Sequence, residues 1–542
     1  MPEHSPRWCL LAALLAFGPL GGCGATDSQP RPDTVIVRSP QEPDSLNPFL
    51  TGMSAATDAW QPIFSGLLTV DERMRFVPDL AIEVPTPENG GVRAEGAGMV
   101  VTYKLRPGVS WHDGKPLTSR DVAFTARVLA APAVHVVERE GYDLVTRVET
   151  PDALTARVHF KAVYAPYLKL FKAILPAHRL ERSKDLNTDP FNRAPLGTGP
   201  FELVEWRSGE RLLYRANPRY FRGRPGIEQL EIRVLPDDNA AFVQLKNGAI
   251  DVYQSVNLNQ RDTLQRVPGV TVHETPALLW EHLSFNTESP FFRDARVRRA
   301  IAHAIDKELL SQKVYGGLWK PAWSDQNPLS WAYDPGLAQH TPFDPARARR
   351  LLDQAGWLPG PDGVRARDGR RFSVTLATTA GKKNRETAQL LIRHFLREVG
   401  IDVRLDNHPG VTLFAAWPAG LLKSGRFEMA MWAWDTGPDP DNVNTWHSTR
   451  IPPLGANQTR FKHPEVDRLL IAATRTFRQA ERQVFYRRIS TILAQEAPNV
   501  PLLYWTSLDA VQARVKGFRP NPTSAGNLWN VWAWSLEPLT AP

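Results

Sequence analysis

Residues Phe427-Glu-Met-Ala-Met-Trp-Ala-Trp-Asp-Thr-Gly-Pro-Asp-Pro-Asp-Asn442 join a strand signal to a turn signal. The first eight, 427–434, are almost wholly apolar on both alternating faces, which is typical of a strand buried on both sides. The run ends at the carboxylate of Asp435, and turn-forming residues follow. Two interpretations are open: a core strand that ends in a polar turn, or a strand that brings an acid and two tryptophans to a ligand pocket.

Length and composition set the outer limits of the fold. The 542-residue chain is too long for one hydrophobic core, so two or three domains are expected. It is 42% hydrophobic and 23% charged, as folded proteins are. The formal net charge is +8, but Lys and Arg are dispersed among the acids without a long run of like charge. We therefore expect no nucleic-acid partner.

The N-terminus has the pattern of an export signal. Arg7 precedes the apolar run 8–17, which is too short to span a bilayer and has the length of a signal-peptide core. The run leads to Leu20-Gly-Gly-Cys23, which resembles the lipobox of bacterial lipoproteins. That resemblance implies a lipid on Cys23. The alternative is an ordinary secretory signal with an incidental cysteine.

These patterns predict where the folded part begins. We expect a signal peptide at 1–22 and a polar tether at 23–32, which contains Pro and Ser and has no reason to fold. Cys9 lies within the signal and Cys23 is the other cysteine, so the mature protein forms no intramolecular disulfide. The expected location is the periplasm or cell envelope, with a lipid anchor in a membrane.

The rest of the chain alternates between strand and helix patterns. Strands are predicted at 33–38, 100–105, 145–148, 154–160, 201–206, 211–214, 227–235, 249–253, 372–376 and 401–405. Helices are predicted near 122–129, 166–173, 238–246, 294–309, 345–356, 385–399, 464–475 and 478–497. The segment 372–405 has the order strand, helix, strand, which predicts a right-handed crossover between parallel strands.

No motif specifies an enzyme. Gly197-Thr-Gly199 lacks the third glycine of a dinucleotide fingerprint, and His273-Glu-Thr-Pro-Ala277 lacks the second histidine of a zinc protease. No Gly-x-Ser-x-Gly elbow occurs, and the thirteen histidines are scattered without ligand spacing. We predict a protein without catalytic activity, cofactor or metal.

Five phrases of the sequence carry a family resemblance. They are Leu105-Arg-Pro-Gly-Val-Ser-Trp-His-Asp-Gly-Lys-Pro-Leu-Thr-Ser-Arg-Asp-Val122, Pro195-Leu-Gly-Thr-Gly-Pro-Phe201, Phe285-Asn286, Asp294-Ala-Arg-Val-Arg-Arg-Ala-Ile-Ala-His-Ala-Ile-Asp306 and Trp434-Asp-Thr-Gly-Pro-Asp-Pro-Asp441. In this order, behind a lipobox, they resemble bacterial extracellular solute-binding protein family 5, the peptide- and nickel-binding proteins of ABC importers.

The resemblance implies an α/β fold of the two-lobed periplasmic-binding-protein type (type II, Venus flytrap), with an inserted middle domain and ligand enclosed by hinge closure. Lobe I is expected to be discontinuous, the middle domain to be inserted into it, and lobe III to be continuous. The expected ranges are 33–71, 195–276 and 502–542 for lobe I, 72–194 for the middle domain and 277–501 for lobe III. The pattern of predicted strands and helices also changes near Pro195 and near Leu279, and this observation does not depend on the resemblance.

The resemblance also implies site residues. In peptide binders of the family, the acid that matches Asp435 pairs with the α-ammonium of the ligand, whose backbone pairs as an added strand. We also expect ligand contacts from Trp434, Thr436, Asn286 and Asn47. The partner of a peptide carboxylate is not identified, because Arg and Lys are too dispersed.

Trp432 and Trp434 lie on the same face of the predicted strand. We expect Trp434 to line the pocket and Trp432 to fill the core.

The function implied is that of a monomeric, lipid-anchored binding protein. It would capture short peptides between its lobes and deliver them to an ABC permease in the inner membrane. The same scaffold also serves nickel chelates, haem, saccharides and antibiotics, which stay open as ligands. A non-transport role as an envelope sensor or chaperone is a further alternative. An exported hydrolase would need a nucleophile and base that the sequence does not supply.

Overall fold

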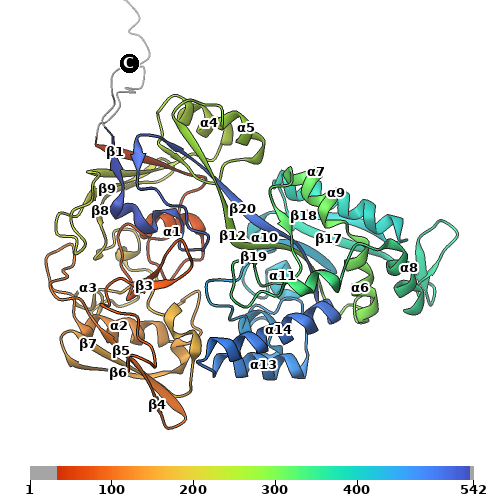
Figure 1. Cartoon of the computed structure of the whole chain (residues 1–542), viewed down its shortest axis with the longest axis horizontal. Helices are drawn as coiled ribbons and strands as arrows, with labels where there is room; N and C mark the ends of the chain where they lie inside the picture. The colour runs from red at the N-terminus through yellow and green to blue at the C-terminus, as the bar shows by residue number, and fades with distance from the viewer. Residues whose placement is uncertain (1–32, 538–542) are drawn as a thin grey trace, which may run out of the picture. The chain divides into compact units, whose positions relative to one another are not determined.

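The computed structural model describes residues 33–537. Within this range one large sheet has the strand order β18-β17-β19-β12-β20-β11-β1-β10-β9-β8, with β13 paired to β20 beside that path (Figure 1). Its strands are Thr34–Ser39 (β1), Phe201–Arg207 (β8), Arg211–Ala216 (β9), Gln229–Val234 (β10), Val252–Tyr253 (β11), Val270–Phe285 (β12), Lys320–Pro321 (β13), Ser373–Thr379 (β17), Asp402–His408 (β18), Met429–Asp435 (β19) and Asn499–Gln512 (β20).

Two long strands join the parts of this sheet. β12 and β20 pair antiparallel from Val270 opposite Gln512 to Ser284 opposite Asn499, with irregularities after Pro276 and after Glu281. On one side β20 pairs with β11, and on the other β12 pairs with β19 (Figure 1). The expected boundaries 276/277 and 501/502 fall inside these two strands. The division of the chain into lobes at these positions stays a prediction.

The quoted stretch forms β19, a strand in the interior of the sheet. β19 runs antiparallel to β12 and parallel to β17. Met429, Ala430 and Met431 are fully buried, so the apolar pattern on both faces is explained by protein on both sides. The predicted strand-helix-strand unit is also confirmed: β17, the helix Lys383–Glu398 (α9) and β18 follow each other, and β17 and β18 are parallel.

Helices and smaller sheets complete the described part. The longer helices are Ser119–Ala130 (α2), Asp238–Lys246 (α4), Ala295–Ala304 (α6), Lys307–Tyr315 (α7), Pro345–Gln354 (α8), Pro464–Thr474 (α13) and Gln479–Glu496 (α14). The shorter ones are Ser54–Trp60 (α1), Ala177–Leu180 (α3), Arg261–Leu264 (α5), Gly410–Leu413 (α10), Leu421–Ser424 (α11) and Val443–Trp446 (α12). The smaller sheets contain Leu68–Val70 (β2), Phe76–Pro78 (β3), Val92–Glu95 (β4), Gly98–Lys104 (β5), Val145–Asp152 (β6), Thr155–Phe160 (β7), Leu358–Pro359 (β14), Arg365–Arg367 (β15), Arg370–Arg371 (β16), Val515–Lys516 (β21) and Ser535–Leu536 (β22).

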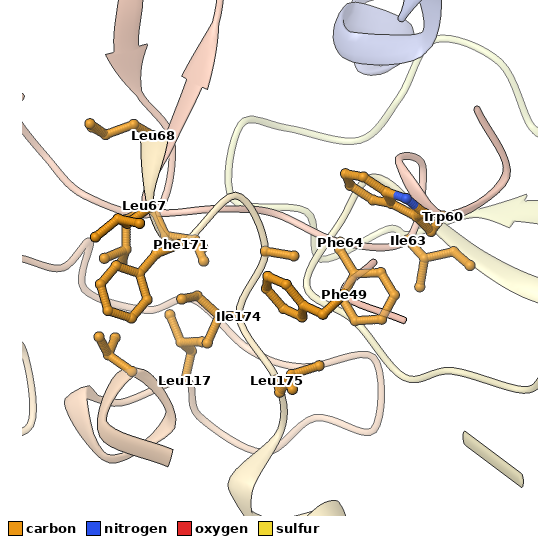
Figure 2. Packing of buried hydrophobic residues seen from close by; sticks show 14 of the residues in the cluster. Phe49, Trp60, Ile63, Phe64, Leu67, Leu68, Leu117, Phe171, Ile174 and Leu175 are labelled. Atoms are coloured by element: carbon orange, nitrogen blue, oxygen red, sulfur yellow. The ribbon is translucent and has the colours of Figure 1, made fainter. Parts of the chain in front are cut away.

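A hydrophobic core lies between the segment that follows α1 and the segment around residue 171. Figure 2 shows Phe171 and Ile174 beside Leu67 and Leu117. The backbones of the two segments are joined as well, since Leu67 N–H donates to the carbonyl of Phe171 over 3.0 Å. Residues of the range 72–194 are therefore packed tightly against the chain that leads into it.

Two predicted helices are wrong in extent. The helix predicted near 294–309 is split into α6 and α7, because Asp306 accepts a hydrogen bond from the Leu309 N–H and caps a new helix. Beyond the break, the side chain of Leu309 is 37% exposed. The helix expected at 166–173 is reduced to a 3₁₀ turn at Ala165–Lys169 (η2), after which Phe171 has a left-handed φ of 58°.

We predict that Gly197→Ala destabilises the protein. A Cβ atom on Gly197 would lie 1.8 Å from the carbonyl oxygen of Ile63, and backbone cannot yield as a flexible side chain does. The free energy of unfolding should fall by about 1–3 kcal/mol, as for other overpacked sites. Denaturant unfolding measures it. Gly410→Ala is the control, because the nearest atom to its Cβ is Thr379 Cγ2 at 3.7 Å. Equal stability of the two variants would contradict the prediction.

Candidate ligand-binding site

Asp435 ends β19 in a place with few partners for its charge. Its Oδ1 accepts a hydrogen bond from the Gly437 N–H over 2.9 Å. Burial raises the pKa of the Asp435 carboxyl; hydrogen bonds from Gly437 and Ser524 oppose this, and the charge of Glu138 adds to it. Among residues 33–537, no basic side chain lies within ion-pair distance of this carboxylate. Asp435 is half-buried, and an acid in such a place with only neutral donors is suited to receive a cation.

Asp325, a buried acid without a local sequence signal, holds the loop after Asp435. Asp325 Oδ2 accepts hydrogen bonds from Asn442 Nδ2 at 2.6 Å and Trp446 Nε1 at 2.7 Å. The hydroxyl of Thr436 donates to the backbone carbonyl of Asp325 over 2.6 Å. Burial raises the pKa of Asp325, and the two side-chain donors counteract that rise. Thr436 thus serves to position the loop.

The two later aspartates of the loop both have cationic partners. Asp439 accepts two hydrogen bonds from Arg482 of α14, at 2.9 and 2.7 Å, an arrangement that fixes both side chains. Asp441 pairs at 3.0 Å with Lys169 of η2, and its own side chain is 1% exposed. The loop is therefore tied to two other segments, while Asp435 at its start has no ion pair in the described range.

The two tryptophans of β19 differ in burial. Trp432 lies opposite His282 of β12 and is 3% exposed, whereas Trp434 lies opposite Trp280 and is partly exposed. Both line a small internal cavity that has room for about one water molecule. The indole N–H groups of Trp432 and Trp280 have no hydrogen-bond partner among the described residues. Trp434 as a ligand contact stays a prediction.

The predicted asparagines lie in other surroundings. Asn286 follows Phe285, which pairs with Met429 at the far end of β19, about 20 Å from Asp435 at 3.3 Å per residue. Its Nδ2 donates to the carbonyl of Gly425. Asn47 is 4% exposed, and its Nδ2 donates to Asn192 Oδ1 over 2.9 Å. The structure does not bring Asn286 to Asp435, and the Asn47 amide is used inside the protein.

Cys23 and the expected signal peptide lie outside the described residues. Across residues 33–537, no helix has the length and apolar character needed to cross a membrane. The same range contains no cluster of three or more His, Cys, Asp or Glu side chains that could hold a metal ion.

Comparison with known proteins gives a consistent match. Residues 76–450 match the family described as bacterial extracellular solute-binding proteins, family 5 Middle. Oligopeptide-binding protein AppA of Bacillus subtilis is 28% identical over 516 residues, which are 93% of this chain and 91% of AppA. Protein XP55 of Streptomyces lividans is 30% identical over 469 residues, or 86% of this chain and 82% of XP55.

Solved structures agree with this match. The structure of AppA from B. subtilis, in complex with a nonapeptide, has a TM-score of 0.80 and covers 93% of this chain and 99% of its own. NikZ of Campylobacter jejuni, in complex with Ni(L-His), has a TM-score of 0.82 with the same coverage, and at 24% identity it shows the fold alone. The predicted two-lobed periplasmic-binding-protein fold is confirmed.

We predict that Lys169→Met destabilises the protein and does so more at high pH. Lys169 lies 3.0 Å from Asp441 and 3.8 Å from Glu140, so its loss leaves two enclosed acids unpaired. Breaking such a pair costs about 3 kcal/mol. Burial and the charge of Asp441 raise the pKa of Glu140 to about 7. Glu140 is therefore largely ionised near pH 8 and largely neutral near pH 5, so the loss of Lys169 leaves more unpaired negative charge at pH 8.

Denaturant unfolding of wild type and variant at the two pH values measures this effect. Lys161→Met is the control, because Lys161 is exposed and has no ion pair among the described residues. An equal loss of stability at both pH values would contradict the assignment of Glu140 to this cluster.

Proposed function

We propose that this chain, which belongs to the bacterial extracellular solute-binding proteins of family 5, captures short peptides outside the cytoplasm for an ABC importer. The observation that carries the proposal is the half-buried carboxylate of Asp435, which ends an interior strand and has no cationic partner among residues 33–537. The α-ammonium of a peptide would fill that place. No catalytic step is part of this role.

The energetics favour an ammonium ligand at Asp435. Burying an ammonium costs several kcal/mol unless acceptors receive it, and each charged hydrogen bond returns about 1.5–3 kcal/mol. The carboxylate already bears the cost of leaving water, as its raised pKa reports. A cation placed beside it recovers part of that cost and restores the ionised form. A bound cation would lower the pKa of Asp435, so binding would release a proton wherever the carboxyl group of the empty protein is still protonated.

The relatives support peptides as the ligand class. AppA is named for oligopeptide binding, and its structure holds a nonapeptide. The match extends over nearly the full length of both chains, so the ligand-binding region of AppA has a counterpart here. We propose Asp435, Trp434 and Thr436 as the part of the site on β19 and its loop, with Thr436 acting through the Asp325 backbone.

The proposal includes attachment to the cell envelope. Removal of residues 1–22 would leave Cys23 as a lipidated first residue, and the tether 23–32 would connect it to the folded part. The bound peptide would pass to a permease of the inner membrane. Attachment places the protein at the permease without need of a membrane-spanning helix.

The anchor predicts a change of cell fraction. Cys23→Ser removes the thiol that would take the lipid, so the protein should move from the membrane fraction to the soluble exported fraction. Fractionation followed by immunoblotting measures this, and Cys9→Ser is the matched control within the expected signal. A wild-type protein found wholly in the soluble exported fraction would rule out the anchor.

Replacement of Asp435 tests the peptide role. Asp435→Asn keeps an oxygen to accept from Gly437 N–H but removes the charge. Affinity for a peptide with a free N-terminus should fall by about 1.5–3 kcal/mol, or tenfold and more. An N-acetylated peptide should bind wild type and variant equally weakly. Isothermal titration calorimetry measures both.

The melting temperature of the empty protein provides the control. It should stay nearly unchanged in Asp435→Asn, because the side-chain oxygen still accepts the hydrogen bond from the Gly437 N–H. A loss of stability as large as the loss of affinity would make Asp435 a structural residue and contradict the proposal.

A further inference from the structure

Two further acids have acceptor oxygens without a donor in the described range. Asp58 lies on α1 and is half-buried, and its carboxylate has no hydrogen-bond or ion-pair partner among residues 33–537. Asp509 lies on β20 and is 3% exposed. Its Oδ1 accepts from the Ser255 N–H over 3.0 Å, whereas its Oδ2 has no partner in the described part. A buried oxygen without a donor is costly, so its persistence calls for a ligand.

The two acids and a glutamine converge on one segment of backbone. A Cβ atom on Gly526 would lie 2.9 Å from Asp58 Oδ1 and 3.8 Å from Gln61 Oε1. Gln61 Oε1 also lacks a donor among the described residues. The side chain of the next residue, Asn527, lies near Asp509 and opposes the rise in the pKa of its carboxyl group. We call Asp58, Gln61 and Asp509 the acceptor cluster.

The acceptor cluster adjoins the place of Asp435. The side chain of Ser524 lies near Asp435 and opposes the rise in the pKa of its carboxyl group, and Gly526 faces the acceptor cluster. Ser524 and Gly526 are two residues apart in the chain, so their Cα atoms are separated by at most about 7 Å. A peptide that begins at Asp435 could therefore reach the acceptor cluster with a side chain of one of its first residues.

The charge of the acceptor cluster is uncompensated. No basic side chain of the described range lies within ion-pair distance of either carboxyl group. Burial raises the pKa of Asp58 to about 7, with a contribution from the charge of Asp509, and burial raises the pKa of Asp509 to about 6. Tyr214, the other ionisable neighbour of Asp58, donates its hydroxyl to Ala59 and supplies no positive charge.

The chemistry of the cluster selects the ligand group. Gln61 Oε1 and Asp509 Oδ2 are buried acceptors without a donor, and the half-buried Asp58 carboxylate is also an acceptor, so the complementary group is a donor with several N–H bonds. Water could supply hydrogen bonds but no positive charge. A Lys ammonium or an Arg guanidinium supplies both.

We propose that Asp58, Asp509 and Gln61 form a second cation-binding subsite, which receives a Lys or Arg side chain of the bound peptide and gives the protein a preference for basic peptides. This inference rests on the proposed peptide-binding function and names the class of peptide.

Calorimetry with matched pentapeptides tests the subsite. Each peptide has alanines and one variable residue, placed in turn at positions 1 to 4, and the variable residue is Lys, norleucine or Glu. Norleucine has nearly the shape of Lys without its charge. Wild type should bind Lys over norleucine by about tenfold at one position or more, the ratio expected for one charged hydrogen bond. Glu at that position should bind more weakly than norleucine.

Variants separate the subsite from Asp435. In Asp58→Asn and in Asp509→Asn the ratio of Lys to norleucine affinity should fall toward one. Asp368→Asn should leave the ratio unchanged, because Asp368 is 92% exposed. In wild type the ratio should also rise between about pH 5.5 and pH 8, as the two acids lose their protons, and this rise should be smaller in Asp58→Asn.

The outcomes distinguish the two proposals. If wild type binds none of the peptides, the proposed function fails. If it binds them but takes Lys and norleucine equally at every position, or prefers Glu, the inference is overturned while peptide binding stands. A ratio that survives in both Asp58→Asn and Asp509→Asn would also overturn it.

Discussion

The antiparallel pairing of β12 with β20 is the constraint on which the rest of the described structure depends. β19 is aligned by β12, with Asp435 opposite Leu279, and Asp509 of β20 lies opposite His273. Leu279 and His273 are six positions apart in β12, with an irregularity between Pro276 and Trp280. Both carboxylates are thus held on strands of one sheet. A loop could not hold two charges at a defined distance so well.

Charge compensation separates the structural acids from the others. Asp439 and Asp441 are enclosed, but Arg482 and Lys169 pair with them. Such pairs gain little over apolar packing, although removal of one partner is costly, so they fix the arrangement of segments. Asp435 and Asp58, in contrast, have no cation within ion-pair distance in the described range. The protein supplies counter-charges where a loop must be held and leaves them out where a ligand can bring its own.

The sequence predicted the parts of the fold that depend on local pattern. The apolar residues 427–434 predicted an interior strand, and 372–405 predicted parallel strands joined by a helix. The break at Asp306 was missed, because the apolar stripe continues past it while the cap interrupts the helix. The ion pairs of the loop after Asp435 could not be predicted from local pattern, because Lys169 and Asp441 are 272 residues apart in the chain. Asp58 also lacks a local signal, because an acid on a short helix has the pattern of an ordinary exposed face.

The register of β12 against β19 decides which of the predicted site residues can lie in one site. Asn286 and Asp435 both belong to phrases that resemble the family, but antiparallel pairing sets them at opposite ends of β19. Membership of a family therefore determines the fold, whereas the ligand contacts must be established residue by residue. The same frame is compatible with ligands of different charge. The choice among them must come from groups whose charge the protein does not neutralise, and in the described range these include Asp435, Asp58 and Asp509. All three are acids, so a ligand with more than one positive group satisfies this interior better than a neutral or anionic one.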